Sequence, residues 1–255
     1  MKKTLVIVQA RTGSTRLPGK VLLPLAGKTV LEKQLERILA APARFELCVA
    51  TTTAPRDEAI VQICRKAGVP SMTGHPTDLL DRHVQAARAA GADVVVKIPS
   101  DCPLIDPAAI ARVLGAYAGE DYLGNLHPAT WPDGNDVEVM AMAALETAWC
   151  EADRPFQREH TTPFLWDQPG RFRVGNVRWE TGLDWSRTHR FTLDHPDDYE
   201  LVCAIYDELG PRPFGLDAIR ALLDERPEIL RINARHHGAT WMDHHAHELQ
   251  TLGVP

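Results

Sequence analysis

The first half of the chain alternates long apolar runs with segments of helical periodicity, and this alternation limits the fold more than any other feature. An apolar run without polar interruption is typical of a strand buried on both faces. TLVIVQA (4–10) is such a run, and FELCVATT (45–52) and DVVVKI (93–98) are two further predicted strands. Between them we predict helices over residues 29–39, 56–67 and 77–90, and a short strand over 71–73. This order predicts an α/β fold with a Rossmann-like, mostly parallel sheet and helices on both faces.

The pattern changes after residue 120. Aspartate, glycine, proline and tryptophan interrupt residues 121–136, and residues 136–140 alternate as an antiparallel strand does. Further predicted helices cover 141–151, 157–166, 196–209 and 216–223, and further predicted strands cover 172–177 and 190–193. We therefore expect a single domain over residues 1–233 with a smaller antiparallel excursion at about 121–190, and a histidine-rich tail over 234–255.

Composition removes several classes of protein. The net charge of −6 disfavours a general nucleic-acid binder, although local cations can still serve a nucleotide. The five cysteines are scattered singly without a CxxC pair, so neither a zinc knuckle nor a disulfide framework is indicated. The N-terminal apolar run from Leu5 to Val8 is too short for a signal peptide, and no stretch reaches the length of a membrane span. We expect a cytoplasmic protein.

The segment after the first strand reads QARTGSTRLPGK and carries three cations within ten residues. Glycines let backbone N–H groups approach phosphate oxygens, and arginine and lysine neutralise phosphate charge, so the segment suits a nucleoside triphosphate. It is not a Walker A loop, because five residues separate Gly13 from Gly19 and Val21 stands where Ser or Thr would hold Mg²⁺. A solvated, positively charged turn is the alternative. The predicted nucleotide-binding residues here are Gln9, Ala10, Arg11, Gly13, Ser14, Thr15, Arg16 and Lys20, with Arg11, Arg16 and Lys20 also catalytic.

Beyond this loop the chain resembles the cytidylyltransferases of bacterial surface-sugar synthesis. These include the 3-deoxy-manno-octulosonate and acylneuraminate cytidylyltransferases, and the likeness extends in particular to the spore-coat polysaccharide biosynthesis protein F group. The motifs that carry it are VQARTGSTRLPGKVLLPLAGKTVLE, VATTTAPRDEAIV, GHPTDLLDRH, VVVKIPSDCPLIDP, PDGNDVEVM, QREHTTPFL, RFTLDHPDDYELV and PEILRIN. They run in order from Leu5 to about Asn233, and imply a nucleotide-diphospho-sugar transferase type of fold.

The resemblance implies that Asp101 and Asp194 hold Mg²⁺. Asp101 follows a predicted buried strand, so its carboxylate lies at the edge of the sheet beside the phosphate loop. Mg²⁺ needs only one or two carboxylates in addition to substrate phosphates. Helix capping is the alternative for each, since Asp101 stands before Pro103 and Asp194 before Pro196. The resemblance also places the pyrimidine near Thr51 and Thr52 and near the start of the phosphate loop, with the backbone of Ala10 beside the base edge. Thr51, Thr52 and Asp101 are thus further predicted nucleotide-binding residues.

The excursion at 121–190 is expected to bind the acceptor or to mediate dimerisation. Sugars need many hydrogen bonds, and anionic sugars need an arginine or a histidine. In the spore-coat relatives the first motif usually reads Asp-Gly-Leu-Asp, and here Asn135 replaces the leucine. Surface salt bridges are the alternative for the arginines. The predicted acceptor-binding residues are Asp133, Asn135, Asp136, Glu138, Arg158, His160 and Arg190.

These features predict a cytidylyltransferase that moves CMP from CTP to a sugar acid or sugar-like acceptor and releases pyrophosphate, with Mg²⁺ as cofactor and a homodimer as assembly. A glycosyltransferase that uses a nucleotide sugar is one alternative, although no DxD follows an early strand. A sugar-phosphate nucleotidyltransferase using another nucleoside triphosphate is a second. A non-catalytic nucleotide-binding protein is a third, yet Lys20, Asp101 and Asp194 are all present.

The tail after Asn233 holds five of the eleven histidines. His244, His247 and Glu248 could share one side of a helix and bind a transition metal, but no HExxH spacing appears. A tail that faces solvent or contacts a second subunit is the favoured interpretation.

Overall fold

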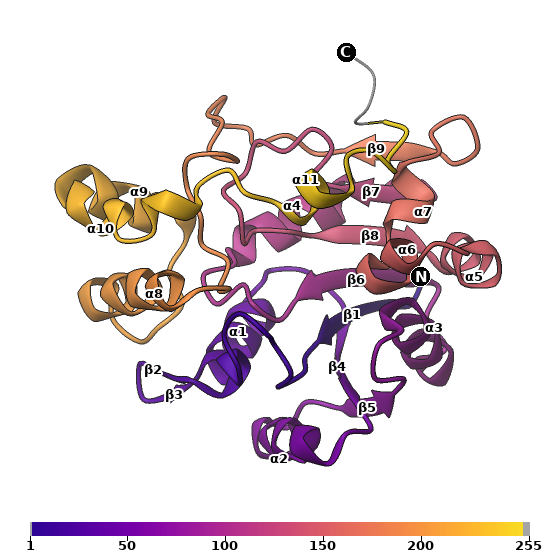
Figure 1. Cartoon of the computed structure of the whole chain (residues 1–255), viewed down its shortest axis with the longest axis horizontal. Helices are drawn as coiled ribbons and strands as arrows, with labels where there is room; N and C mark the ends of the chain where they lie inside the picture. The colour runs from indigo at the N-terminus through magenta and orange to yellow at the C-terminus, as the bar shows by residue number, and fades with distance from the viewer. Residues whose placement is uncertain (1, 252–255) are drawn as a thin grey trace.

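The fold is a seven-stranded sheet in the order β5-β4-β1-β6-β8-β7-β9, covered by helices on both faces (Figure 1). This computed structural model describes residues 2–251, apart from the side chain of His244. The strands are β1 (Thr4–Gln9), β4 (Glu46–Thr52), β5 (Ser71–Gly74), β6 (Val94–Pro99), β7 (Tyr122–Gly124), β8 (Glu138–Ala141) and β9 (Val174–Asn176), and a separate hairpin joins β2 (Pro24–Leu25) and β3 (Lys28–Thr29).

The four strands β5, β4, β1 and β6 are parallel, and β8 pairs antiparallel with both β6 and β7. The chain moves outward from β1 to β4 and β5, and then returns to place β6 on the other side of β1. In doubly wound sheets such a reversal opens a crevice at the carboxyl ends of the two central strands, where ligands bind. The predicted fold class is confirmed, and the loops after β1 and β6 lie at this reversal.

Three apolar clusters hold the layers together. One joins a face of the sheet to α1 (Val30–Leu39), α2 (Glu58–Ala67) and α4 (Pro107–Ala116). A second joins the opposite face to α3 (Leu79–Ala90), α5 (Met142–Glu151), α6 (Pro155–His160) and α7 (Pro163–Trp166). The third is built around α8 (Pro196–Leu209), α9 (Leu216–Glu225) and α10 (Pro227–Arg231), at the left of Figure 1. Short helices are η1 (Lys20–Leu22), η2 (Pro55–Asp57), η3 (Ala234–His236) and α11 (Trp241–His245).

Polar side chains set where the helices begin. Thr29 and Glu32 form a capping box at the start of α1, and the side chains of Asp78 and Asp106 cap α3 and α4. Gly91 ends α3 in the left-handed conformation that lacks a penalty only for glycine. Among the described helices, none is long and apolar enough to cross a membrane.

Two elements differ from the sequence expectation. The strand predicted over residues 190–193 is wrong: the segment is extended, but it forms only an isolated bridge from Arg190 to Asp133. The helix predicted over 157–166 is two short helices, because Thr161 has φ 73° and breaks the turn between α6 and α7. The alternation of residues 190–193 was misleading, since Phe191 and Leu193 are buried beneath α8 rather than in the sheet.

The tail also differs, because it packs on its own chain. Leu249 is buried in the second cluster, and the carboxylate of Asp167 accepts hydrogen bonds from the backbone of Gln250 and Thr251. The tail is therefore fastened to its own chain at residues 249–251, while Asp243, Ala246 and His247 remain exposed, and contact with a second subunit stays a prediction. The side chain of His244 and residues 252–255 lie outside the described part of the chain.

A buried guanidinium ties α1 to the loop that follows β6. Arg37 donates to the carbonyl oxygens of Ile105 (2.7 Å), Leu104 (3.2 Å) and Phe214 (2.6 Å). Arg37→Leu should lower the free energy of unfolding by about 3 kcal/mol or more, because buried carbonyl groups lose charged donors. Urea denaturation measures it, with the exposed Arg44→Leu as control, expected to change stability by less than about 0.5 kcal/mol. Equal stability of the two variants would contradict the assignment.

Candidate active site

Lys20 bridges the two carboxylates that the sequence analysis singled out. Its Nζ donates to Asp101 Oδ2 at 2.7 Å and to Asp194 Oδ1 at 2.8 Å. Burial alone would lower the pKa of Lys20, but the charges of Asp101 and Asp194 outweigh it and raise this pKa above its ordinary value. Because both oxygens contact one nitrogen atom, the two carboxylates converge although 93 positions separate them in sequence.

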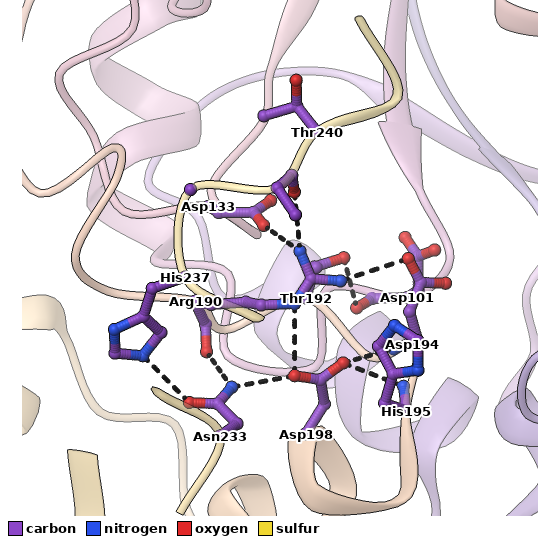
Figure 2. A network of polar contacts seen from close by, with 12 residues as sticks. Asp101, Asp133, Arg190, Thr192, Asp194, His195, Asp198, Asn233, His237 and Thr240 are labelled. Atoms are coloured by element: carbon purple, nitrogen blue, oxygen red, sulfur yellow. Dashed lines mark hydrogen bonds and ion pairs between the residues drawn. The ribbon is translucent and has the colours of Figure 1, made fainter. Parts of the chain in front are cut away.

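Arg190 forms the second node of the site and contacts three carboxylates (Figure 2). It donates to Asp133 (2.9 Å), Asp194 (3.3 Å) and Asp198 (3.2 Å). Arg16 donates to the same oxygen of Asp194 at 2.7 Å. Burial would raise the pKa of Asp194, but the charge of Lys20, with its hydrogen bond, and those of Arg16 and Arg190 lower it, so this group stays ionised.

The backbone, rather than a shared sheet, brings Asp194 to Asp101. The N–H of Leu193 donates to the carbonyl of Asp101 at 2.8 Å, and the N–H of Phe191 donates to that of Asp133 at 2.8 Å. The two backbone segments approach so closely at Gly134 that an added Cβ would lie 2.7 Å from the backbone of Phe191. The φ angle of Gly134 is +94°. Only glycine fits this crossing, which explains its place in the Asp-Gly-Asn-Asp motif.

Neither metal-ligand candidate caps a helix. Asp106, not Asp101, caps α4, and its side chain accepts from the N–H of Ala108. At the start of α8, the side chain of Asp198 accepts from the N–H groups of Asp194 and His195. The carboxylate of Asp194 is therefore left to face Lys20, Arg16 and Arg190, and the capping alternative does not hold for either residue.

The phosphate loop is anchored by Asp57, which the sequence analysis missed. Asp57 accepts from the N–H of Thr12 (2.8 Å) and its hydroxyl (2.6 Å), and it also bonds the hydroxyl of Thr52. Thr52, expected near the base, thus supports the loop instead. The side chain of Arg56 packs so closely on Gly13 that a Cβ there would meet it at 2.4 Å. The segment is a folded loop rather than a solvated turn.

A cavity of about 510 Å³ opens beside these groups. Of the predicted site residues, Gln9, Arg16, Asp101, Asp133, Asp136, Glu138, His160, Arg190 and Asp194 line it. Lys20 is not part of this lining, but it donates hydrogen bonds to two residues that are, Asp101 and Asp194. The lining also includes an aromatic group that the sequence analysis did not select: His127, Trp131, Trp166 and Trp241. These lie far apart in sequence, and no spacing rule marks them.

Two predicted acceptor residues lie elsewhere. Asn135 is buried, and its Oδ1 accepts from the N–H of Asp106 at 2.8 Å, so it shapes a turn. Arg158 donates to Asp78 at 2.5 Å and to the carbonyl of Trp149 at 2.9 Å, so it ties α6 to α3 and α5. Several residues predicted to bind the nucleotide also do not line the cavity: Ala10, Arg11, Gly13, Ser14, Thr15 and Thr51.

Comparison with known proteins identifies the family. A model of the cytidylyltransferase family matches residues 5–227 of this chain. The chain belongs to the cytidylyltransferase family. It is similar to the spore coat polysaccharide biosynthesis protein SpsF of Bacillus subtilis, with 30% identity over 236 residues that cover 89% of this chain and 97% of SpsF.

Two further relatives agree with this cytidylyltransferase assignment. A 3-deoxy-manno-octulosonate cytidylyltransferase of Anaeromyxobacter dehalogenans is 39% identical over 247 residues, covering 88% of this chain and 98% of the relative. The solved cytidylyltransferase of Leptospira borgpetersenii has a TM-score of 0.85 at 29% identity, covering 94% of this chain and 99% of that one. The resemblance inferred from the motifs is confirmed, as is the prediction of a nucleotidyltransferase enzyme.

Some polar atoms of this cytidylyltransferase are buried without a hydrogen-bond partner among residues 2–251. They are Gln9 Oε1, Arg37 Nη1, Thr51 Oγ1, Arg82 Nε and Nη1, His83 Nε2 and Asn135 Nδ2. Buried polar atoms in proteins are normally paired, so such atoms mark places where a ligand can complete the bonding. Gln9 also lines the cavity. Arg82 was missed in the sequence analysis, because nothing in the periodicity of α3 distinguishes it from a surface arginine.

The acceptor side of the cavity holds the carboxyl group of Asp136, which is an unusually weak acid. Burial, and then the charge of Glu138, raise the pKa of Asp136 to about 7. Glu138 itself is paired with Lys97 at 2.5 Å; burial would raise its pKa, but Lys97 lowers it. Asp136 makes no ion pair with any residue in the described range.

Asp136 should make stability fall as pH rises. A carboxyl whose folded pKa exceeds its unfolded value binds a proton more tightly when folded, so stability is lost between the two values, from about pH 4 to about pH 7. Asp136→Asn removes this titration. We expect its Tm to exceed that of the wild type by roughly 3 °C or more at pH 8, and by less at pH 5. Calorimetry measures both, and a Tm difference independent of pH would contradict the shift.

Proposed function

We propose that this cytidylyltransferase transfers CMP from CTP to a sugar acid or sugar-like acceptor for surface-glycan synthesis, with release of pyrophosphate. The observation that carries the proposal is the contact of Lys20 with both Asp101 and Asp194 beside the cavity. This arrangement places a phosphate-binding cation and two carboxylates at one point of the sheet edge. The acceptor class also rests on the relative whose name gives 3-deoxy-manno-octulosonate as its substrate.

The donor set fits a divalent cation, for which Mg²⁺ is the proposed ion. Asp101 and Asp194 offer hard carboxylate oxygens, and the Lys20 ammonium already stands between them as a cation. No group of three or more histidine, cysteine, aspartate or glutamate side chains suited to a metal occurs among the described residues. Two carboxylates plus substrate phosphates suffice for Mg²⁺. When bound, the ion would supply charge neutralisation at the phosphates.

The residues of the chain take the following roles. An acceptor oxygen bonds to the α-phosphorus of CTP, the bond from that phosphorus to the bridging oxygen breaks, and pyrophosphate leaves with the electron pair. The acceptor proton passes to solvent water. Lys20, Arg16 and Arg11 stabilise the charge that develops on the phosphates, mainly because the anchored loop holds them in position beforehand.

Selection of CTP is proposed at the ends of β1 and α3. Cytosine offers two ring acceptors and one amino donor. Arg82 has donors without partners and Gln9 has an acceptor without one, so together they match those groups. Asp133, Asp136 and His160 are the proposed acceptor-binding residues, since they line the cavity. The cytoplasmic location and the homodimer remain predictions from the sequence.

Nucleotide choice tests the proposal directly. Pyrophosphate release should be fastest with CTP when CTP, UTP, GTP and ATP are compared against a panel of sugar acids in the presence of Mg²⁺. Mass spectrometry identifies the CMP-linked product. A preference for a purine triphosphate would remove CTP as the donor, and transfer from a nucleotide sugar would favour the glycosyltransferase alternative.

Asp101 and Asp194 should act as one unit. Asp101→Asn and Asp194→Asn should each reduce turnover by roughly a hundredfold or more, and the double variant should be little worse than either single variant. Steady-state pyrophosphate release measures this, with Asp106→Asn as a helix-cap control that keeps its turnover. Losses that multiply in the double variant would show that the two carboxylates work independently.

Lys20 competes with the proposed ion for the same oxygens. Its side chain is only 11% exposed, so its removal changes stability as well as turnover. Lys20→Ala leaves two carboxylates facing each other, so it should destabilise the metal-free protein and increase the rise in Tm that Mg²⁺ produces. Thermal melts measure this, with the exposed Lys28→Ala as control. The same response to Mg²⁺ in both variants would contradict the site.

A further inference from the structure

The C-terminal segment supplies one wall of the cavity. After α10 the chain turns back across the sheet to α11, seen in yellow in front of β8 and β7 in Figure 1. Residues Ala239, Thr240, Trp241 and Met242 all line the cavity. The match to the family model ends at residue 227, so this wall follows the matched residues.

The wall is fastened to the catalytic centre at one end and to the protein body at the other. Arg190, which holds Asp133 and Asp194, also donates to the carbonyl of Ala239 at 3.2 Å. Beyond α11, the burial of Leu249 and the bonds from Gln250 to Asp167 fix the far end. The segment therefore has a defined position over the cavity.

Aromatic rings face the cavity on this side. The Trp241 indole stacks on His160 with centroids 3.8 Å apart and planes at 14°, and it lies 6.3 Å from Trp166. His127 stacks on Trp166 at 3.9 Å. Burial lowers the pKa of His160 to about 3 and that of His127 to about 4, so these rings are uncharged at neutral pH.

The polar groups of the cavity complement these rings. Asp133 and Asp136 line the same space and present carboxyl oxygens. A sugar ring can bind to both kinds of group. The C–H groups on its face pack against a flat aromatic ring, and the hydroxyl groups at its edge donate hydrogen bonds to carboxylates. Arg16 and Arg190 also line the cavity, so the carboxylate of a sugar acid has a guanidinium partner there.

We propose that Trp241 is a specificity-determining residue, which binds the C–H face of the sugar ring of the acceptor while Asp133 and Asp136 accept from its hydroxyl groups. This inference rests on the proposed function and adds to it the surface that distinguishes acceptors. Acceptor selection then resides in the C-terminal segment, after the residues matched by the family model, whereas CTP binding resides in the strand-end loops.

The test measures binding of sugar and of nucleotide separately. Saturation-transfer NMR with 3-deoxy-manno-octulosonate and N-acetylneuraminate as probes is run on protein saturated with CMP, which has no pyrophosphate leaving group and therefore does not react with the probe. Calorimetry gives the CTP affinity separately. Trp241→Leu keeps an apolar side chain but lacks the flat face, and should weaken probe binding about tenfold. Trp241→Phe should restore most of it, and CTP affinity should stay within about twofold. Trp149→Leu is the matched control, because Trp149 lies on α5 against Arg88.

The outcomes separate this inference from the proposed function. The role of Trp241 is overturned if Trp241→Leu binds the probes as the wild type does, or if the wild type binds neither sugar. If the wild type does not bind CTP, the proposed function is overturned instead. Should Trp241→Leu fail to fold in a thermal melt, the wild type still decides. Irradiation of the aromatic protons of the wild-type protein must then reduce the signals of the ring C–H protons of the bound sugar. If these sugar signals do not change, the proposal is overturned.

Discussion

Carboxylates gathered at one edge of a sheet repel one another unless cations stand between them, and this constraint organises the whole site. Arg190 contacts Asp133, Asp194 and Asp198, and Lys20 contacts Asp101 and Asp194. Each cation is largely buried, so a missing partner would leave an uncompensated charge, which costs several kcal/mol. The phosphate loop, the loop after β6 and the start of α8 are joined by these contacts as well as by apolar packing.

The same contacts explain how the fold prepares the chemistry. The reversal of strand order between β1 and β6 places the phosphate loop beside Asp101, and backbone bonds from residues 191 and 193 bring Asp194 to meet it. Lys20 stands between the carboxylates of Asp101 and Asp194 in the free protein, and the proposed function requires that it exchange them for the phosphates of CTP when a divalent ion binds. The free protein thus holds its charged groups close to the positions that a nucleotide would require, which is the condition for electrostatic stabilisation without large rearrangement.

Local signals explain what was predictable from sequence. Uninterrupted apolar runs identified β1, β4 and β6, and the glycines and cations after β1 identified the phosphate loop, because both depend on residues adjacent in the chain. The pairing of Asp101 with Asp194 was implied by the family resemblance, whereas the bond from the backbone of Leu193 to Asp101 that produces it was not predictable, since residues 190–193 do not form a strand of the sheet. Asn135 and Arg158 were misassigned because polarity does not reveal whether a side chain bonds to its own backbone or to a ligand. The aromatic wall depends on contacts between residues 127, 160, 166 and 241, which no local pattern encodes.

The central claim is that Asp101 and Asp194 bind a divalent ion on the triphosphate of CTP, and the position of that ion tests it most directly. Crystals grown with CTP and Mn²⁺ would locate the ion by its anomalous scattering. The account predicts one peak at about 2.2 Å from a carboxylate oxygen of Asp101, with Asp194 bound directly or through one water, and Lys20 moved onto a phosphate. A peak remote from both carboxylates, with Lys20 still bonded to Asp101 and Asp194, would contradict it.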